Sequence, residues 1–292
     1  MTILVTGSTG TIGKQIVELL AQRGAKVRAL VRGEKATSFP AGVTAVRGDL
    51  TDVTSLRRAF EGVDTLFLLN AVAPDELTQA LLALDAAQRA GVRGLVYLSV
   101  FNGATYKDVP HFVGKYTVEQ AIDHADLPAT VLRPAFFMQN DAALKQALLE
   151  HAVYPMPVGP VGLNMVDTRD VAEVAAIELL RRDSAGGPLP RSIVSVVGPD
   201  RLTGTDIAAV WADVLGRKVT YGGDDLDAFE ARVAQFAPPW SAADLRLMAR
   251  GFQEYGMIAK PTAVATLETL LGRPLRTYRD FARETAAAWA RG

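Results

Sequence analysis

The fold is decided by the opening stretch Met1-Thr-Ile-Leu-Val-Thr-Gly-Ser-Thr-Gly-Thr-Ile-Gly13, in which a short apolar run enters a loop with glycines at positions 7, 10 and 13. This pattern predicts a strand, a tight turn and a helix. Gly7 lets the backbone reverse without a Cβ clash, Gly10 lets a phosphate approach the main chain, and Gly13 lets the helix pack closely on the strand. The free N–H groups at the helix start favour an anion, and a pyrophosphate is the predicted ligand.

The spacing of these glycines is G-x-x-G-x-x-G, one residue longer between the first two than in the dinucleotide-binding motif G-x-G-x-x-G. Residues 3–5 form an apolar run before the loop, and apolar residues recur after it at helical spacing, namely Ile12, Ile16, Leu19 and Leu20. This setting favours a dinucleotide-binding loop over a glycine-rich turn that only connects a strand to a helix. A P-loop is excluded, because Gly13-Lys14-Gln15 lacks the closing Gly-Lys-Ser or Gly-Lys-Thr.

Composition and charge narrow the class of protein. The 292 residues are 49% hydrophobic and 22% charged, which suits one large α/β domain or a domain with an added lobe. The net charge is −1 with both signs interspersed, so we expect no direct nucleic-acid partner and no membrane partner. There is no cysteine, and the three histidines are not spaced as a ligand set, so we expect no metal. No apolar run reaches about 18 residues, which predicts a soluble, cytoplasmic protein.

The end of the predicted second strand, residues 26–31, bears on the choice of dinucleotide. An acidic residue at this tip would bind the adenosine ribose hydroxyls and repel a 2′-phosphate, whereas the arginine found there, Arg32, attracts the phosphate. Arg32, alone or with Lys35, therefore favours NADP(H), with NAD(H) as a second possibility. In the alternative interpretation Glu34 binds the ribose and Arg32 is a solvated surface charge.

The third strand, residues 43–47, leads into Asp49 and Leu50 at the edge of the same crevice. Asp49 is placed to contact the adenine amino group, with Leu50 beside it. Asp49 can equally serve the turn alone, because aspartate is common at turns and helix starts. Thr51 is the predicted cap of the helix that runs to residue 60.

The fourth and fifth strands end in polar residues. Residues 65–69 form a continuous apolar run before Asn70, and the strand over residues 94–99 ends on Ser99. Ligands of parallel sheets lie beyond the carboxyl ends of the strands, so Asn70 and Ser99 are expected at the cofactor cleft. Ser99 can instead be a loop hydroxyl bonded to its own backbone. The alternation of strands and helices predicts a Rossmann-type, doubly wound parallel sheet of order 3-2-1-4-5-6.

Several of these features together resemble the atypical short-chain dehydrogenase/reductase superfamily, within its NmrA-like branch: the stretch Thr6–Gly13, Asp49, Ser99 and Leu132-Arg133-Pro134. The resemblance covers nearly the whole chain. It implies a cofactor-binding loop formed by Gly7, Thr9, Gly10, Thr11, Ile12 and Gly13. The branch includes NAD(P)H-dependent reductases of quinones, dyes or other acceptors, and dinucleotide-sensing regulators.

The resemblance also implies where the chemistry lies. The superfamily carries a Tyr-x-x-x-Lys pair on the helix after the fifth strand, but here the stretch is His111-Phe-Val-Gly-Lys115-Tyr-Thr-Val-Glu119, and none of the seven tyrosines has lysine four residues on. Lys115 can still bind the nicotinamide ribose, and His111 can donate a proton at neutral pH. In the alternative, Lys115 and Glu119 form an exposed ion pair and His111 lies near a cap.

The acceptor is expected beside the nicotinamide. The sixth strand must end at Arg133, because the residue before Pro134 is held extended. The residues predicted to line the substrate site follow it: Phe136, Phe137, Met138 and Asn140. Phe136, Phe137 and Met138 can equally be ordinary core.

The chain is expected to form one unit over residues 1–292, with a smaller, mainly helical C-terminal substrate lobe. Residues 1–135 form the dinucleotide-binding core, 136–165 and 187–292 contribute most of the lobe, and 166–186 return to the core. A strand from Ser192 is expected to begin the lobe. Within it, Thr203 and Asp206 resemble a capping box, and Ser241 to Asp244 are read as a helix start.

The predicted function is an NADPH-dependent reductase that transfers a hydride to a flat, conjugated acceptor such as a quinone or dye, in an apolar cleft between the sheet and the lobe. The missing tyrosine suits such acceptors, which need little proton donation in the rate-setting step. The alternative is a non-catalytic, redox-sensing regulator that binds NADP(H). We expect a monomer or a homodimer.

Overall fold

The computed structural model describes residues 1–33 and 38–291. Glu34, the alternative to Arg32 in cofactor choice, and Lys35, which was expected to assist Arg32, lie outside the described residues. The chain forms two compact units, of which the first comprises residues 1–100, 114–133 and 171–194, and the second comprises residues 101–113, 134–170 and 195–292.

A seven-stranded sheet runs through the first unit in the order β3-β2-β1-β4-β5-β6-β8. Its strands are β1 (Thr2–Val5), β2 (Lys26–Val31), β3 (Val43–Arg47), β4 (Thr65–Leu68), β5 (Gly94–Leu98), β6 (Ala129–Pro134) and β8 (Ser192–Val196). Neighbours from β3 to β6 pair in parallel, with Ile3 opposite Val27 on one side and Thr65 on the other. The predicted Rossmann-type sheet and the order of its first six strands are therefore confirmed.

The seventh strand corrects one prediction. The strand at Ser192 was expected to begin the smaller lobe, but β8 lies beside β6 in the main sheet. At its end, the Ala135 N–H donates to the Val196 carbonyl at 2.9 Å. An added strand satisfies backbone groups that an edge would otherwise leave unpaired.

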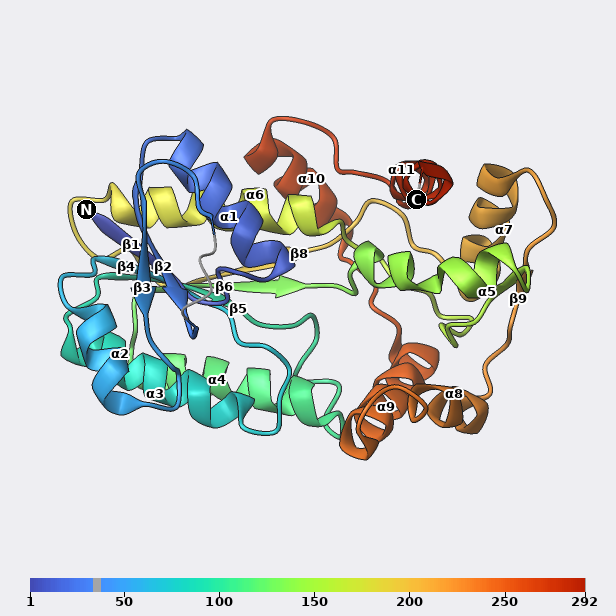
Figure 1. Ribbon diagram of the computed structural model, residues 1–292, viewed down its shortest axis with the longest axis horizontal. Coiled ribbons are helices and arrows are strands. Elements are labelled where there is room, and N and C mark those ends of the chain that lie inside the picture. Colours follow the sequence, from blue (N-terminus) through green and yellow to red (C-terminus); the bar gives the residue numbers. More distant parts are fainter. Residues whose placement is uncertain (34–37, 292) are drawn as a thin grey trace. The chain divides into compact units, whose positions relative to one another are not determined.

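Helices cover both faces of this sheet (Figure 1). One face carries α1 (Thr11–Gln22) and α6 (Thr168–Asp183), and the other carries α2 (Val53–Phe60), α3 (Glu76–Arg89) and α4 (Pro110–His124). The central strands β1, β4 and β5 are buried at every residue, whereas β3 at the edge is largely exposed. This is the burial expected of parallel strands enclosed by crossover helices, and it explains their continuous apolar runs.

The start of α2 differs in detail from the prediction. Thr51 was the expected cap, but the side chain of Asp52 accepts from the Thr54 N–H at 2.9 Å and the Ser55 N–H at 3.2 Å. Thr51 instead donates its N–H and hydroxyl to Asp49, at 2.8 and 2.7 Å. The two side chains share the turn because each satisfies a different part of its backbone.

The second unit is mainly helical. Its elements are η1 (Met138–Leu144), α5 (Lys145–Leu149), β7 (Val153–Tyr154), α7 (Gly204–Leu215), β9 (Thr220–Tyr221), α8 (Leu226–Val233), α9 (Pro239–Tyr255), α10 (Pro261–Leu271) and α11 (Tyr278–Arg291). The capping box predicted at Thr203 and Asp206 is confirmed at the start of α7. Trp211 of α7 stacks on Trp289 of α11 with ring centroids 5.1 Å apart, and this contact joins the two helices.

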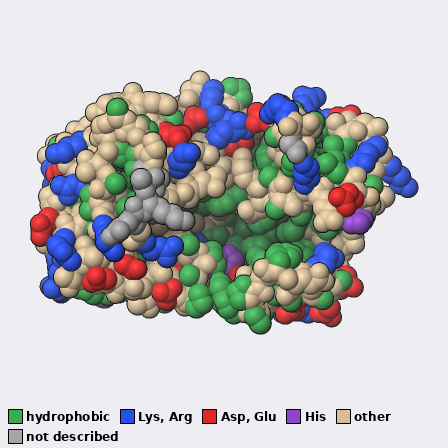
Figure 2. All heavy atoms as spheres, viewed as in Figure 1, with side chains coloured by type: hydrophobic (Ala, Val, Ile, Leu, Met, Phe, Trp, Pro, Cys, Tyr) green, Lys and Arg blue, Asp and Glu red, His purple; other side chains and the backbone are tan. Residues whose placement is uncertain are grey.

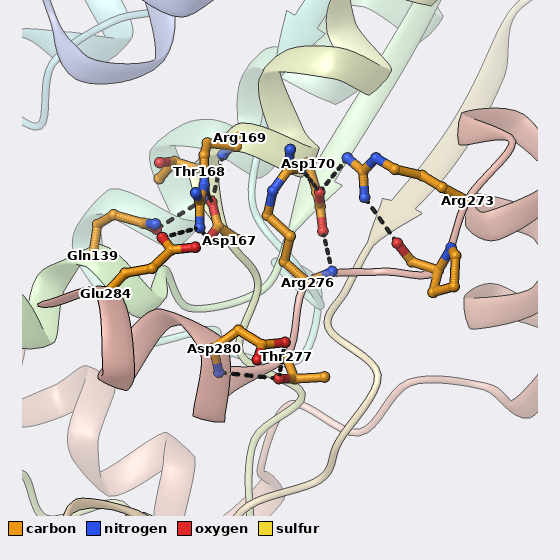
Figure 3. A network of polar contacts seen from close by, with 11 residues as sticks. Gln139, Asp167, Thr168, Arg169, Asp170, Arg273, Arg276, Thr277, Asp280 and Glu284 are labelled. Carbon is orange, nitrogen blue, oxygen red and sulfur yellow. Dashed lines mark hydrogen bonds and ion pairs between the residues drawn. The ribbon is translucent and has the colours of Figure 1, made fainter. Parts of the chain in front are cut away.

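An ionic network fixes the segment between α10 and α11 (Figure 3). Buried Asp170 accepts from an Arg273 guanidinium N–H at 2.7 Å and from the Arg276 backbone N–H at 3.0 Å. Arg169 bridges Asp167 at 2.7 Å and Glu284 of α11 at 2.8 Å. These contacts hold the chain before α11 against residues 167–170.

The surface agrees with the balanced composition. On the face drawn in Figure 2, basic and acidic side chains are interspersed and form no continuous stripe of one sign. Within the described ranges, every helix is too short or too polar to cross a bilayer. The same part of the chain holds no group of three or more His, Asp or Glu side chains arranged to bind a metal ion.

Candidate functional site

The glycine loop after β1 has the geometry that its sequence predicts. Gly7 has φ +61°, in the left-handed region, and turns the chain. A Cβ on Gly13 would lie 2.1 Å from the carbonyl oxygen of Gly7, so this position admits only glycine. Gly10 is extended, with φ −83° and ψ 172°, and it is the N-cap residue directly before α1. The three glycines thus turn the loop, start the helix and bring the helix onto the loop.

Hydroxyl groups anchor this loop to the neighbouring strands. Thr6 donates to the carbonyl of Leu69, beyond the end of β4, at 2.9 Å and accepts from the Leu69 N–H at 2.8 Å. Ser8 donates to the carbonyl of Leu30 in β2 at 2.7 Å. The loop is therefore held from both sides before any ligand arrives. Neither role was predicted, although both residues belong to the quoted motif.

The start of α1 is open to an anion. Its first N–H groups have no partner within the helix, Gly10 offers no capping side chain, and the first turn has no acidic residue. A Cβ on Gly10 would meet only the Gly7 oxygen, at 3.4 Å, so the remaining space beside the backbone is free of protein atoms. The positive end of the helix dipole thus faces a position that no carboxylate of the loop fills.

A cavity of about 350 Å³ lies beside this loop in the first unit. It brings together seven of the predicted cofactor-binding residues: Gly7, Thr9, Gly10, Arg32, Asp49, Leu50 and Asn70. The remaining residues of the lining are Leu30, Gly48, Leu69, Ala71, Ala73 and Gln79. Five predicted residues are not part of this lining: Thr11, Ile12, Gly13, Ser99 and Lys115.

Asn70 is the clearest sign of a ligand in this cavity. Asn70 is only 4% exposed, yet neither its amide oxygen nor its amide nitrogen has a hydrogen-bond partner among the described residues. A buried amide without partners costs free energy, and native proteins rarely leave one unsatisfied. A polar ligand in the cavity would supply the missing donor and acceptor.

A second cavity, of about 520 Å³, adjoins the carboxyl ends of β2 and β3 and shares Arg32, Gly48 and Asp49 with the first. Arg47 and Arg58 add two further guanidinium groups to its lining, together with Ser55 and Asp52. Hydrogen bonds from the Thr51 backbone and hydroxyl hold the pKa of Asp49 below its usual value, and the charge of Arg32 acts in the same direction. The charges at this end of the site suit a phosphate group.

Lys115 is not the exposed half of an ion pair with Glu119. Its ammonium donates to Glu76 at 2.5 Å, and both side chains are only 9% exposed. Glu76 lies in the first turn of α3, where a carboxylate also interacts favourably with the helix dipole. The interpretation of Lys115 and Glu119 as an exposed pair is therefore wrong, because both side chains are buried and each has a different partner.

Glu119 instead joins Ser99 to Arg133. The Glu119 carboxylate accepts from the Ser99 hydroxyl and from the Arg133 Nε at 3.1 Å, with a second contact from the same guanidinium. Ser99 is thus a buried hydroxyl at the end of β5 that bonds to a side chain. The alternative interpretation, in which the Ser99 hydroxyl bonds to its own backbone, is therefore wrong. Burial raises the pKa of Tyr97 well above its usual value, and the negative charges of Glu76 and Glu119 add to this effect.

His111, at the start of α4, pairs with a residue that was not predicted. Its Nδ1 contacts a carboxylate oxygen of Asp244, and its backbone N–H donates to the other oxygen at 3.1 Å. The predicted helix start at Ser241 is also corrected, since α9 begins at Pro239, a residue whose fixed φ suits the first helical position. Asp244 consequently lies inside α9, and it is buried. Acidic side chains are rarely buried without a partner, and His111 is the partner here.

The second unit holds an apolar cavity of about 550 Å³. Two of the four predicted substrate residues, Phe136 and Asn140, line it, whereas Phe137 and Met138 do not. The remaining apolar lining consists mainly of Met156, Phe229, Val233, Phe236, Leu245 and Met248. Met138 is buried core, as its alternative interpretation held.

Asp141 belongs to the same lining and forms a buried polar network. Burial raises the pKa of Asp141 to about 7, although hydroxyl donation from Tyr278 at 2.5 Å and Tyr154 at 3.1 Å favours its charged form. Tyr278 in turn accepts from the Trp211 indole N–H at 2.9 Å. The network fixes the side chain of Asp141 in the lining of the cavity.

Comparison with known proteins agrees with this geometry. The sequence matches the NmrA-like family over residues 1–280. The chain belongs to the NmrA-like family. It is 32% identical to NAD(P)H azoreductase of Xenophilus azovorans, over 98% of this chain and 99% of the relative.

Two further comparisons cover almost the full length of both proteins. The chain is 35% identical to (4-alkanoyl-5-oxo-2,5-dihydrofuran-3-yl)methyl phosphate reductase of Streptomyces griseus, over 99% of each protein. The crystal structure of an NADPH-dependent quinone oxidoreductase from Escherichia coli matches with a TM-score of 0.83 and 25% identity, covering 98% of this chain and 99% of that structure. The family and fold implied by the sequence motifs are confirmed.

A pair of glycine substitutions in the NmrA-like loop separates binding from folding. Gly10→Val should fold, because the backbone of Gly10 is open to any residue, but it should lose NADPH binding because the branched side chain occupies the anion position. Gly13→Ala should instead lower stability, by about 1 to 3 kcal/mol or more, because its Cβ has no room.

Calorimetric titration with NADPH and thermal unfolding measure both effects. Gly186→Val is the matched control, since a Cβ there meets nothing within 4 Å, and it should bind NADPH as the native protein does. A folded Gly10→Val variant with native affinity would contradict the placement of the pyrophosphate.

Proposed function

We propose that this NmrA-like protein is an NADPH-dependent reductase that transfers a hydride to a flat, conjugated acceptor such as a quinone or dye. The observation that carries the proposal is the cavity beside the start of α1, where the buried amide of Asn70 has no partner among the described residues. A dinucleotide supplies both an anion for the helix and polar groups for this amide. The names of the azoreductase and quinone oxidoreductase relatives support the same chemistry.

Different residues of the first unit bind different parts of the cofactor. The N–H groups of Thr11, Ile12 and Gly13 with the open backbone of Gly10 hold the pyrophosphate. Arg32 binds the 2′-phosphate, and Asp49 and Leu50 contact the adenosine. NADPH, when bound, supplies the hydride. Asn70 and Ser99, at the ends of neighbouring strands, contact its nicotinamide half.

Lys115 and His111 are the proposed catalytic residues of α4. An ammonium group has three N–H donors, so Lys115 can bond to Glu76 and still hold the nicotinamide ribose. Its burial with Glu76 keeps the charge in one place, and a fixed ribose keeps the nicotinamide in reacting geometry. His111 lies one helical turn before Lys115 and is the candidate proton donor.

The acceptor is bound by apolar and aromatic side chains. Phe136 and Asn140 line the cavity of the second unit, and the neighbouring Phe137 and Met138 complete the proposed substrate set. Aromatic rings contact the faces of a flat, conjugated molecule, while Asn140 offers hydrogen bonds to its polar edge. The protein itself then contributes binding, orientation and exclusion of water.

Replacing Arg32 with aspartate should reverse the preference for the phosphorylated cofactor. The change removes a charged partner of the 2′-phosphate and adds repulsion, so NADPH affinity should fall by roughly 10- to 150-fold, as for a hydrogen bond to a charged group worth about 1.5 to 3 kcal/mol. NADH affinity should change much less. Titration of both cofactors measures the effect.

Arg23→Asp is the control for this experiment, because Arg23 is also exposed but lies at the far end of α1. It makes the same change in net charge and should leave both affinities as they are. An unchanged cofactor preference in Arg32→Asp would mean that Arg32 is only a solvated surface charge.

The reductase itself is tested by steady-state oxidation of NADPH against a panel of quinones, azo dyes and cationic dyes. We expect turnover with at least one of these acceptors, and none in Gly10→Val. Tight NADPH binding without turnover on any acceptor would favour the alternative, a redox-sensing regulator of the NmrA type.

A further inference from the structure

Asp244 of α9 contacts two nitrogen atoms of His111 at the start of α4. Both oxygens of the Asp244 carboxylate are used: one contacts Nδ1 of His111, and the other accepts from the backbone N–H of the same residue at 3.1 Å. The Asp244 side chain is only 3% exposed and that of His111 is 13% exposed. The carboxylate is thus withdrawn from solvent and contacts both the imidazole and the backbone N–H of His111.

The surroundings fix the ring as well as its partner. Phe112 meets the His111 ring edge to face with centroids 4.7 Å apart, and Tyr106 stacks on Phe112 at 4.7 Å. The hydroxyl of Tyr106 donates to the Gly256 carbonyl at 2.8 Å, which ties this stack to the end of α9. Asp108, three residues before His111, forms an ion pair with Arg250 of α9.

This geometry has a consequence for the position of the proton. An ionised carboxylate only accepts hydrogen bonds, so when Asp244 is ionised the hydrogen of this contact lies on Nδ1 of His111. A neutral His111 then has its lone pair on Nε2, and a protonated His111 has its transferable proton there. Histidine is the side chain whose charge changes near neutral pH, and the hydrogen bond at one nitrogen sets the role of the other.

We propose that Asp244 is a positioning residue that fixes the tautomer of His111, so that Nε2 delivers a proton to an acceptor whose reduction leaves a negative charge. The proposal rests on the proposed reductase function. It concerns quinones in particular, and it separates them from cationic dyes, which become neutral when they gain a hydride.

The step balances with the reactants already named. A quinone that receives the hydride and its electron pair from NADPH becomes a hydroquinone monoanion, while the nicotinamide is oxidised. The Nε2–H bond of protonated His111 breaks and an O–H bond forms on the quinone oxygen. His111 is left neutral, with Nδ1–H still donated to Asp244, and it regains a proton from water.

The tautomer can be measured without turnover. The chain has only three histidines, so ¹⁵N-histidine labelling gives three ring systems, and loss of one signal in His111→Phe assigns the relevant one. We expect neutral His111 to carry its hydrogen on Nδ1, and this state to be lost in Asp244→Asn. The exposed His124 and His151 are internal references. A neutral His111 with hydrogen on Nε2 in the native protein would overturn the assignment.

The kinetic measurement tests the proton. Asp244→Asn should lower kcat for a quinone by roughly 10- to 100-fold, somewhat less than the loss of a general acid, and leave the KM for NADPH and the rate with a cationic dye nearly unchanged. Asp227→Asn, an exposed acid of α8 paired with Arg246, is the matched control and should have native rates.

The outcomes of the two measurements are distinct. Equal losses of activity with the quinone and the cationic dye would mean that Asp244 only supports the fold, and would overturn the proposal. If the native protein reduces no acceptor, the reductase function and proton delivery both fail, whereas the ¹⁵N spectrum still decides whether Asp244 sets the tautomer.

Discussion

The close approach of α1 to the loop that precedes it is the contact on which the proposed site depends. A Cβ at Gly13 would lie 2.1 Å from the Gly7 oxygen, so no other residue allows the helix to start so near the loop. This approach points the first N–H groups of α1 at the space beside Gly10. Thr6 and Ser8 then fix the loop to its two neighbouring strands, so the anion site exists before the anion binds.

Buried charges perform the second organising task. Lys115 is held by Glu76, and Glu119 is held by Arg133 and Ser99, all withdrawn from solvent to a large degree. Breaking a buried pair by removing one partner leaves a charge without compensation and typically costs about 3 to 5 kcal/mol. Such pairs therefore keep α4 in one register relative to the sheet. That register determines what the lysine and the histidine of this helix can reach.

Much of the fold could be predicted from the sequence because its signals are local. Three glycines at fixed spacing and continuous apolar runs determine how β1, β4 and β5 form and pair. The edge strand β8 was assigned to the smaller lobe because most of its residues are only partly buried and its sequence carries no sign of its partner. The sequence of one strand does not by itself indicate which distant strand it pairs with.

The lining of the cavity beside α1 was also predictable in large part, since many of its residues follow the ends of strands whose order was known. The partners of Lys115 and His111 were not. Glu76 lies 39 residues from Lys115, and Asp244 lies 133 residues from His111. Both acids occur within helices where charged residues are common on exposed faces, so only the packing of the helices shows that they are buried.

The central claim, that this chain moves a hydride rather than only sensing the cofactor, is tested most directly by a single turnover with deuterated NADPH. The native protein in excess would be mixed with NADPH carrying deuterium in one or the other C4 position, and with the acceptor that it reduces fastest. We predict that deuterium in one C4 position slows oxidation of the nicotinamide, and that deuterium in the other leaves the rate nearly unchanged. Equal rates with both labelled cofactors, or no oxidation of tightly bound NADPH by any acceptor, would contradict the claim.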